Sequence, residues 1–333
     1  MNIAIVGLGY WGPNLLRNFN SLENCDVKYV VDKRDDQFPK FKALYENVNF
    51  ITEIDSVLED QSVEAVVIAT PVFTHFPIAK RALLSGKNVL IEKPITSTTE
   101  EADELIKIAK EKNLVLMVDH TFLYTGAVMK IKSLVESGEL GELKYFDSTR
   151  INLGLFQADV NVLWDLAPHD ISILNFIFKE EPYSVQATGA SHTDNGLENI
   201  AYLTVNYKSG MIAHFNCSWT SPVKVRQTLI GGDKKMALYN DMEPSEKIKI
   251  YDFGYEVKTN EEKNRIIADY RTGDVLVPKL DSTEALLGVA KDFISSIESG
   301  DKPKSDCYLG REVVRILEAS QESLKKRGEE IIL

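Results

Sequence analysis

The glycine-rich stretch near the start of the chain constrains its fold more than any other feature. Glycines stand at positions 7, 9 and 12, a G-x-G-x-x-G spacing that follows an apolar run and precedes an apolar helix pattern. Gly7 permits a tight turn, Gly9 lets backbone N–H groups approach a pyrophosphate, and Gly12 lets the next helix pack on its strand. A strand, this turn and a helix in that order predict a dinucleotide-binding unit.

A carboxylate at the end of the second expected strand indicates which dinucleotide binds. The apolar run at residues 27–31 ends in Asp32, about 20 residues after Gly12. Such a carboxylate accepts the ribose hydroxyls of NAD and repels the 2′-phosphate of NADP, so NAD is favoured. Lys33 and Arg34 follow at once, and two interpretations of them stay open: partners for that phosphate, which would admit NADP, or solvated loop cations.

Length and charge narrow the class of protein. A chain of 333 residues is long enough for two domains. A net charge of −12 opposes binding to nucleic acid or to an anionic membrane surface. Cys25, Cys217 and Cys307 are far apart, as expected of reduced thiols in a cytoplasmic protein. The N-terminal apolar residues lead straight into the glycine turn, so we interpret them as a strand and expect neither a signal peptide nor a membrane span.

The first third of the chain alternates apolar runs with amphipathic helices, which is typical of a parallel sheet covered on both faces. The capping box Thr98-x-x-Glu101 begins a helix at residues 98–112, and Ser85-Gly86 ends an earlier helix that starts near Thr74. We expect a doubly wound Rossmann domain over residues 1–121. Its strands are expected at residues 3–7, 27–32, 49–51, 65–70, 88–92 and 114–119.

The rest of the chain has a different pattern. A helix at residues 124–137 precedes longer alternating strands with turns at residues 208–210 and 231–234. Residues 122–333 are therefore expected to form an α+β domain with a large, open-faced, mostly antiparallel sheet. Residues 256–281 are irregular and polar, which suggests an insertion or a loose loop. Helices at residues 282–299 and 309–326 end the chain, and a second subunit is expected to cover the open sheet face.

Two expected strands of the first domain end in residues that suit a binding cleft. Thr70-Pro71 follows the fourth strand and Glu92-Lys93-Pro94 ends the fifth, and ligands bind at the carboxyl edge of a parallel sheet. The proline restricts Lys93 to an extended conformation that directs its ammonium into the cleft. The alternative is an exposed lysine at a strand end.

Histidines near this edge are further candidates. His75 begins a helix beside the edge of the sheet where the cofactor is expected. The alternative is that it is only a residue of the first helical turn with no role at the cofactor. His120 follows the sixth strand and is placed to line the cleft.

Asp165 and His169 form a second candidate group, because residues four apart share one face of a helix. Pro168 predicts an irregular opening turn. In the alternative interpretation Asp165 caps the helix and His169 is a half-buried helix residue. Beside a nicotinamide, these side chains suit hydride transfer from an alcohol: His169 takes the proton, Lys93 stabilises the alkoxide, and Asp165 orients the imidazole or binds a hydroxyl. A competing assignment makes Lys93 the base. No metal-binding motif is expected.

These landmarks, in this order, resemble the glucose-fructose oxidoreductase / inositol dehydrogenase / rhizopine-catabolism (Gfo/Idh/MocA) family of NAD(P)-dependent sugar oxidoreductases. The resemblance runs over nearly the whole chain, to a last helix beginning Gly310-Arg-Glu-Val-Val. It implies a Rossmann domain followed by a substrate domain that assembles dimers or tetramers. The implied cofactor residues are Gly7, Gly9, Tyr10, Trp11, Gly12, Asp32, Lys33, Thr70, Pro71, His75, Glu92 and Lys93, and the implied substrate residues are Lys93, His120, Tyr124, Asp165 and His169.

One segment departs from the family pattern. Many members carry an arginine and a proline after the sixth strand, where this chain has Leu123 and Gly126. The resemblance therefore does not establish the substrate contacts that this segment makes elsewhere.

Within the family, the Gly-Tyr-Trp-Gly-Pro-Asn opening and the stretch Trp-Asp-Leu-Ala-Pro-His-Asp are most similar to members that act on nucleotide sugars in polysaccharide biosynthesis. This resemblance implies oxidation of a ring hydroxyl, such as C3 of UDP-N-acetylglucosamine. The alternatives are a free-sugar or inositol dehydrogenase, an enzyme that uses NAD transiently in glycoside cleavage, and a regulator that binds NAD and sugar without chemistry. Lys93, Asp165 and His169 argue against the regulator, because a binder needs no base.

Overall fold

The computed structural model describes residues 1–154, 156–157, 159–260 and 265–333. Its contacts divide the chain into two compact units. The first unit comprises Met1–Thr125 with Thr283–Arg315, and the second comprises Gly126–Ser282 with Ile316–Leu333. The domain boundary between residues 121 and 122 stays a prediction.

The first unit is built on a six-stranded sheet in the order β3-β2-β1-β4-β5-β6, with every pair parallel. This is the predicted Rossmann sheet. Its central strands are mostly apolar and buried, because helices cover both faces. The strands are β1 Asn2–Val6, β2 Asp26–Val31, β3 Asn49–Ile51, β4 Ala65–Ile68, β5 Asn88–Glu92 and β6 Leu116–Asp119.

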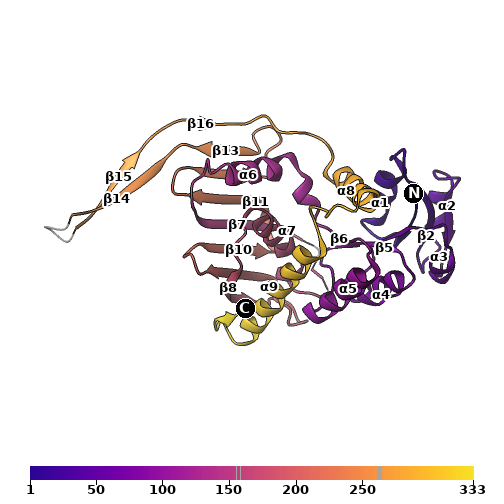
Figure 1. Ribbon diagram of the computed structural model, residues 1–333. Coiled ribbons are helices and arrows are strands. Elements are labelled where there is room, and N and C mark those ends of the chain that lie inside the picture. The colour runs from indigo at the N-terminus through magenta and orange to yellow at the C-terminus, as the bar shows by residue number, and fades with distance from the viewer. Residues whose placement is uncertain (155, 158, 261–264) are drawn as a thin grey trace. The chain divides into compact units, whose positions relative to one another are not determined.

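Helices α1 and α8 share one hydrophobic core with the sheet (Figure 1). Phe19 of α1 meets Phe293 of α8 edge to face, with ring centroids 6.3 Å apart. This packing explains why residues late in the chain join the first unit. The helices of this unit are α1 Gly12–Asn20, α2 Phe38–Lys42, α3 Asp55–Glu59, α4 His75–Leu84, α5 Thr99–Lys112 and α8 Ala285–Ser299, with short 3-10 turns at Val72–Thr74 and Thr121–Tyr124.

Local signals placed several helix ends correctly. The Thr98 side chain accepts a hydrogen bond from the Glu101 N–H at 3.2 Å, as the capping box predicts. The Glu101 side chain accepts from the Ser97 N–H instead of the Thr98 N–H. Helix α8 ends at Gly300 in the left-handed conformation, where a glycine is favoured.

The second unit contains a nine-stranded sheet in the order β16-β13-β12-β11-β7-β10-β9-β8-β17. Only β10 and β7 pair in parallel among the described strands of this sheet, so the predicted, mostly antiparallel sheet is confirmed. Its strands are β7 Leu143–Leu153, β8 Pro182–Ala190, β9 Ile200–Tyr207, β10 Ile212–Ser218, β11 Thr220–Gly232, β12 Met236–Asn240, β13 Ile248–Tyr251, β16 Val275–Leu276 and β17 Ile331–Ile332.

Helix α7 (Val162–Ile177) packs against β7, β9 and β10, with α6 (Gly126–Glu136) beside it (Figure 1). Helix α9 (Cys307–Lys325) begins in the first unit and ends in the second. The turns at residues 208–210 and 231–234 join antiparallel strands as predicted.

The expectation of a loose loop at residues 256–281 is wrong, while that of an insertion stays a prediction. Strand β14 (Gly254–Asn260) pairs antiparallel with β15 (Arg265–Arg271), and β16 pairs with β13. Residues 261–264 lie outside the described chain. The segment is polar in sequence, so it has no hydrophobic alternation to indicate strands, whereas the backbone bonds of a two-stranded ribbon need none.

Candidate functional site

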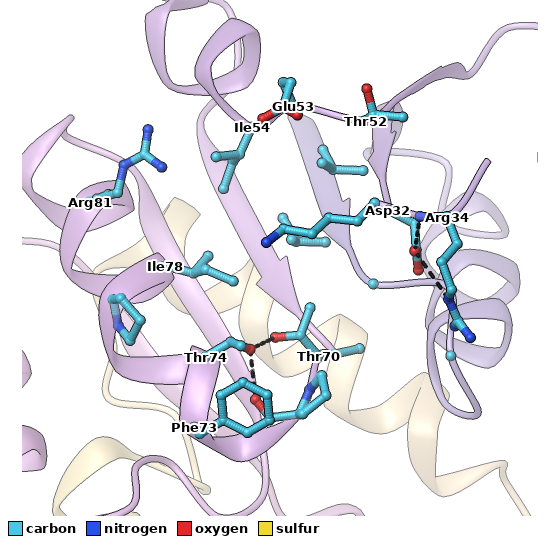
Figure 2. A pocket seen from close by; sticks show the side chains of 18 residues that line it. Asp32, Arg34, Thr52, Glu53, Ile54, Thr70, Phe73, Thr74, Ile78 and Arg81 are labelled. Carbon is cyan, nitrogen blue, oxygen red and sulfur yellow. Dashed lines mark hydrogen bonds and ion pairs between the residues drawn. The ribbon is translucent and has the colours of Figure 1, made fainter.

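A cavity of about 700 Å³ opens at the carboxyl edge of the Rossmann sheet (Figure 2). This is where the parallel fold places a ligand. Six of the predicted cofactor residues line it, namely Gly7, Gly9, Asp32, Lys33, Thr70 and Pro71. The other predicted cofactor residues lie outside its lining.

The glycine turn has the geometry that its spacing predicts. Gly7 has a φ of +104°, and a Cβ there would lie 2.5 Å from the Ala69 carbonyl oxygen. At Gly12 a Cβ would lie 2.0 Å from the Gly7 oxygen, so only glycine lets α1 begin against the turn. A Cβ at Gly9 would meet nothing within 4 Å. Gly9 therefore borders open space at the start of α1, and the turn fits a pyrophosphate.

Asp32 is fixed by the backbone around it. Its Oδ2 accepts a hydrogen bond from the Leu8 N–H at 2.6 Å, and its Oδ1 accepts one from the Arg34 N–H at 2.8 Å. The Arg34 Nε lies 3.7 Å from Oδ1 (Figure 2). The carboxylate is therefore held between the glycine turn and the end of β2, and each oxygen has a further lone pair for a ribose hydroxyl.

Tyr10 and Trp11 extend from the turn toward solvent, with exposed fractions of 85% and 39%. Their rings touch edge to face at 5.3 Å. Contact between either ring and a cofactor stays a prediction.

His75 braces the sheet edge. Its Nδ1 lies 2.9 Å from the Pro94 carbonyl oxygen, and its Nε2 lies 2.8 Å from the Thr70 oxygen. The ring therefore links the segments after β4 and β5. Burial lowers the pKa of His75. Both ring nitrogens face backbone acceptors, so direct cofactor contact by His75 stays a prediction.

The end of β5 carries a buried charged group. Glu92 is 8% exposed and lies opposite Asp119, the last residue of β6, which is 2% exposed. Burial raises the pKa of both carboxyls, to about 6 for Asp119. The charge of Asp119 raises the pKa of Glu92 further, whereas the hydrogen bond with Glu92 lowers that of Asp119. Lys93 follows Glu92 and is joined to Pro94 by a cis peptide. Asp119 was not among the site residues predicted from the sequence, although its place at the end of the neighbouring strand was a usable signal.

Two further predicted substrate residues follow β6. His120 is 1% exposed, and burial together with the charge of Lys93 lowers its pKa to about 3. Neither His120 ring nitrogen has a hydrogen-bond partner among the described residues. The Tyr124 hydroxyl donates to Asp292 of α8 at 2.6 Å. Its contact with a substrate therefore stays a prediction.

In the second unit, Asp165 and His169 lie on α7, and both are half-buried. The N-cap is Asn161, whose side chain accepts from the Leu163 and Trp164 N–H groups, so the interpretation of Asp165 as the cap is wrong. The helix also runs through Pro168, contrary to the expected irregular turn. Asp165 lies in the first turn of α7 and accepts a hydrogen bond from the Trp219 indole N–H at 2.9 Å.

A buried ion pair that was not predicted from the sequence anchors this helix. Arg150 of β7 donates from Nε and Nη2 to Asp170 of α7, at 2.8 and 2.7 Å. Both side chains are 3% exposed. The pair fixes α7 on the sheet one residue from His169.

Within the part of the chain that the structure describes, no group of three or more His, Cys, Asp or Glu side chains is arranged to hold a metal ion. None of the described helices combines the length and the apolar character needed to cross a membrane.

Comparison with protein families agrees with the two-part architecture. Residues 1–120 match the GFO_IDH_MocA model, described as an oxidoreductase family with an NAD-binding Rossmann fold. Residues 128–238 match the GFO/IDH/MocA C-terminal domain.

Several curated relatives share part of the chain. UDP-N-acetylglucosamine 3-dehydrogenase of Acidithiobacillus ferrooxidans is 31% identical over 222 residues, 66% of this chain and 67% of that protein. The 2,7-anhydro-N-acetylneuraminate hydratase of Mediterraneibacter gnavus is 26% identical over 58% of this chain and 53% of its own length. An uncharacterized oxidoreductase of Schizosaccharomyces pombe is 37% identical, but the match spans only 42% of its length. The chain thus spans about half the length of several relatives that it matches.

Solved structures share the fold over nearly the full length. A structure of the same A. ferrooxidans dehydrogenase superposes with a TM-score of 0.81 at 24% identity, covering 98% of each chain. GenD2 from gentamicin A biosynthesis, in complex with NAD, gives a TM-score of 0.84 at 20% identity, covering 100% of this chain and 96% of that one.

Proposed function

The chain belongs to the Gfo/Idh/MocA family of NAD-binding oxidoreductases, and on that premise we propose that it is an NAD-dependent nucleotide-sugar dehydrogenase. The proposed reaction moves hydride between a ring carbinol, such as C3 of UDP-N-acetylglucosamine, and the nicotinamide. The observation that carries the substrate class is the 31% identity to UDP-N-acetylglucosamine 3-dehydrogenase over 67% of its length. Bound NAD supplies the hydride acceptor for such a reaction.

The residues of the first unit suit this cofactor. The open space at Gly9 and the start of α1 receive the pyrophosphate, and Asp32, already oriented by the Leu8 N–H, receives the ribose hydroxyls. A carboxylate fixed in this way disfavours the additional phosphate of NADP. We assign the NAD preference to Asp32 on this ground.

The proton chemistry is assigned to three side chains. His169 takes the hydroxyl proton as hydride leaves, because an imidazole exchanges protons near neutral pH. Lys93 stabilises the developing alkoxide. Asp165 orients the imidazole or binds a sugar hydroxyl, with its own carboxylate held by the Trp219 N–H at 2.9 Å. Lys93 as the base remains the competing assignment.

A second candidate is a reaction on a glycosidic or anhydro sugar with no net oxidation. The match to a protein named a hydratase favours it. It would use the same NAD site and the same acid/base residues.

The test is incubation of the purified chain with NAD and separate panels of UDP-sugars, free sugars, inositols and glycosides. NADH formation, followed by its near-ultraviolet absorbance, with a UDP-sugar supports the proposal. NADH formation with free sugars or inositols alone would show that the substrate is one of these and not a nucleotide sugar. A released or hydrated sugar without NADH supports the second candidate, and NAD binding without any product indicates a regulator. Lys93→Ala serves as the matched control, because it should remove turnover in either catalytic case.

A further inference from the structure

Two carboxyl groups meet at the end of the Rossmann sheet beside Lys93. Glu92 and Asp119 are register partners on the parallel strands β5 and β6. Register partners point to the same face of a sheet, and adjacent strands lie about 4.8 Å apart. With exposed fractions of 8% and 2%, the two groups have little water to separate their charges. Two carboxylates in such a place do not both ionise near neutral pH.

The hydrogen bonds show where a proton is needed. Oε2 of Glu92 accepts from the Lys93 N–H at 3.1 Å, and Oδ1 of Asp119 accepts from the Thr121 hydroxyl at 2.6 Å. Oδ2 of Asp119 is buried and receives no donor from the other described groups. The neighbouring Glu92 carboxyl lies within hydrogen-bonding reach of Asp119. A proton on Glu92 satisfies the buried oxygen of Asp119, whereas two carboxylates leave it unsatisfied.

The surrounding groups determine the charge that the pair carries. The Lys93 ammonium acts on Glu92, Asp119 and His120. His120 is neutral at pH 7, since burial and Lys93 hold its pKa at about 3. Tyr124 is neutral as well, because burial and Asp292 raise its pKa. One negative charge on the pair therefore matches the one positive charge on Lys93.

We propose that Glu92 and Asp119 share one proton, carry a single negative charge between them, and act as the positioning pair that holds the Lys93 ammonium at the end of β5. The link to turnover rests on the proposed function, in which Lys93 acts on the substrate. The shared proton itself does not depend on the proposed function.

Amide variants separate this role from a structural one. In Glu92→Gln the amide donates to an ionised Asp119, and in Asp119→Asn the amide donates to an ionised Glu92, so each single variant keeps one negative charge. The double variant keeps none. We expect each single change to lower kcat by less than about fivefold and the double change to lower it by about 100-fold or more, far beyond the product of the singles. A double-variant loss equal to that product would overturn the shared charge.

Two readouts do not depend on activity. Difference infrared spectra of wild type against each single variant at pH 7 should show a carboxylic-acid C=O band that is present only in wild type. Asp306→Asn, which changes another buried carboxyl of the first unit, is the control and should leave that band in place. Absence of the band in wild type, or its persistence in either single variant, would refute the shared proton.

Reductive methylation followed by mass spectrometry tests the link to Lys93. The double variant should methylate Lys93 at least about threefold faster at pH 8 than wild type, because loss of the negative charge favours the uncharged amine. Equal rates would show that the pair does not act on Lys93. If no sugar is oxidised by any variant, the proposed function fails while the infrared and methylation results still decide this inference.

Discussion

Trp219 donates its indole N–H to Oδ2 of Asp165 across 2.9 Å, joining the corner between β10 and β11 to helix α7. The indole is 1% exposed. It packs against Gly154, where a Cβ would lie 2.8 Å from the ring, and against Phe156, whose ring centroid is 5.7 Å away. The sheet thus sets the orientation of the Asp165 carboxylate, to which we assign a role at the substrate.

Trp219→Phe removes this donor and keeps most of the packing. A hydrogen bond to a charged group contributes about 1.5–3 kcal/mol, so we expect kcat/KM to fall about 10- to 100-fold. NAD affinity should be unchanged, since Trp219 belongs to the second unit. Steady-state kinetics on the substrate found in the panel measure the effect. Trp164→Phe, on α7 itself, is the matched control, and an equal loss in both variants would contradict a specific role for Trp219.

Lys93→Ala and His169→Ala should each lower kcat by about 100-fold or more, because each removes a group assigned to the proton or the alkoxide. Dinucleotide binding should persist, since neither side chain lines the cavity at Asp32. NADH fluorescence titration and single-turnover rates separate the two effects. Rates like those of wild type in both variants would remove the proposed mechanism.

Asp32→Ala should weaken NAD binding and reduce the discrimination against NADP. The change removes both the acceptor for the ribose hydroxyls and the acceptors of the Leu8 and Arg34 N–H groups. We expect Kd for NAD to rise about 10- to 100-fold, as for the loss of one or two charge-assisted hydrogen bonds. Asp32→Asn, which retains an acceptor without the charge, distinguishes turn geometry from repulsion of the phosphate. An unchanged preference for NAD in both variants would show that Asp32 does not contact the ribose.

Local sequence signals predicted the parts of this fold that depend on neighbouring residues. The left-handed Gly7, the Thr98 cap and the terminal Gly300 were all readable, because each requirement is met within a few positions. The heptapeptide around Asp165 was located as well, but its actual cap, Asn161, was missed. Asp165 was a possible cap because the helix was expected to begin after it, whereas the helix begins at Val162.

Contacts between distant residues were not predictable in this way. The ends of the fifth and sixth expected strands indicated where Glu92 and Asp119 meet. The bonds from Trp219 to Asp165 and from Arg150 to Asp170 instead follow from how α7 packs on its sheet. No local pattern encodes such packing. The strands β14 and β15 were missed for a related reason, since their pairing needs no apolar face.

The carboxyl pair should also affect stability as pH changes. Burial raises the pKa of folded Asp119 to about 6, against about 3.9 in an unfolded chain. Between about pH 4 and pH 6 the folded state therefore binds more protons than the unfolded state. The stabilisation that protonation of Asp119 gives the folded state is complete below about pH 4 and is lost as the pH rises through about 6. A pKa difference of about 2 corresponds to at most about 3 kcal/mol of unfolding free energy. Urea unfolding at pH 4.5 and 7 should show that Glu92→Gln/Asp119→Asn gains stability relative to wild type at the higher pH, and a constant difference between the two proteins would contradict the raised pKa.

The Arg150–Asp170 pair should be costly to break and far less costly to replace. Burial alone would lower the pKa of Arg150, but the charge and hydrogen bonds of Asp170 raise it above its usual value, so the guanidinium stays charged in the core. Asp170→Asn or Arg150→Met leaves one buried charge without its partner, which should lower the free energy of unfolding by about 3–5 kcal/mol. Arg150→Met/Asp170→Leu removes both charges and should recover most of that loss, because apolar side chains of similar volume need no desolvated partner. Urea unfolding of the three variants measures this, and a double variant less stable than either single one would show that attraction within the pair outweighs its desolvation. Asp170 adjoins His169 in the chain. If the double variant folds well but turns over slowly, the pair also positions His169, the proposed base.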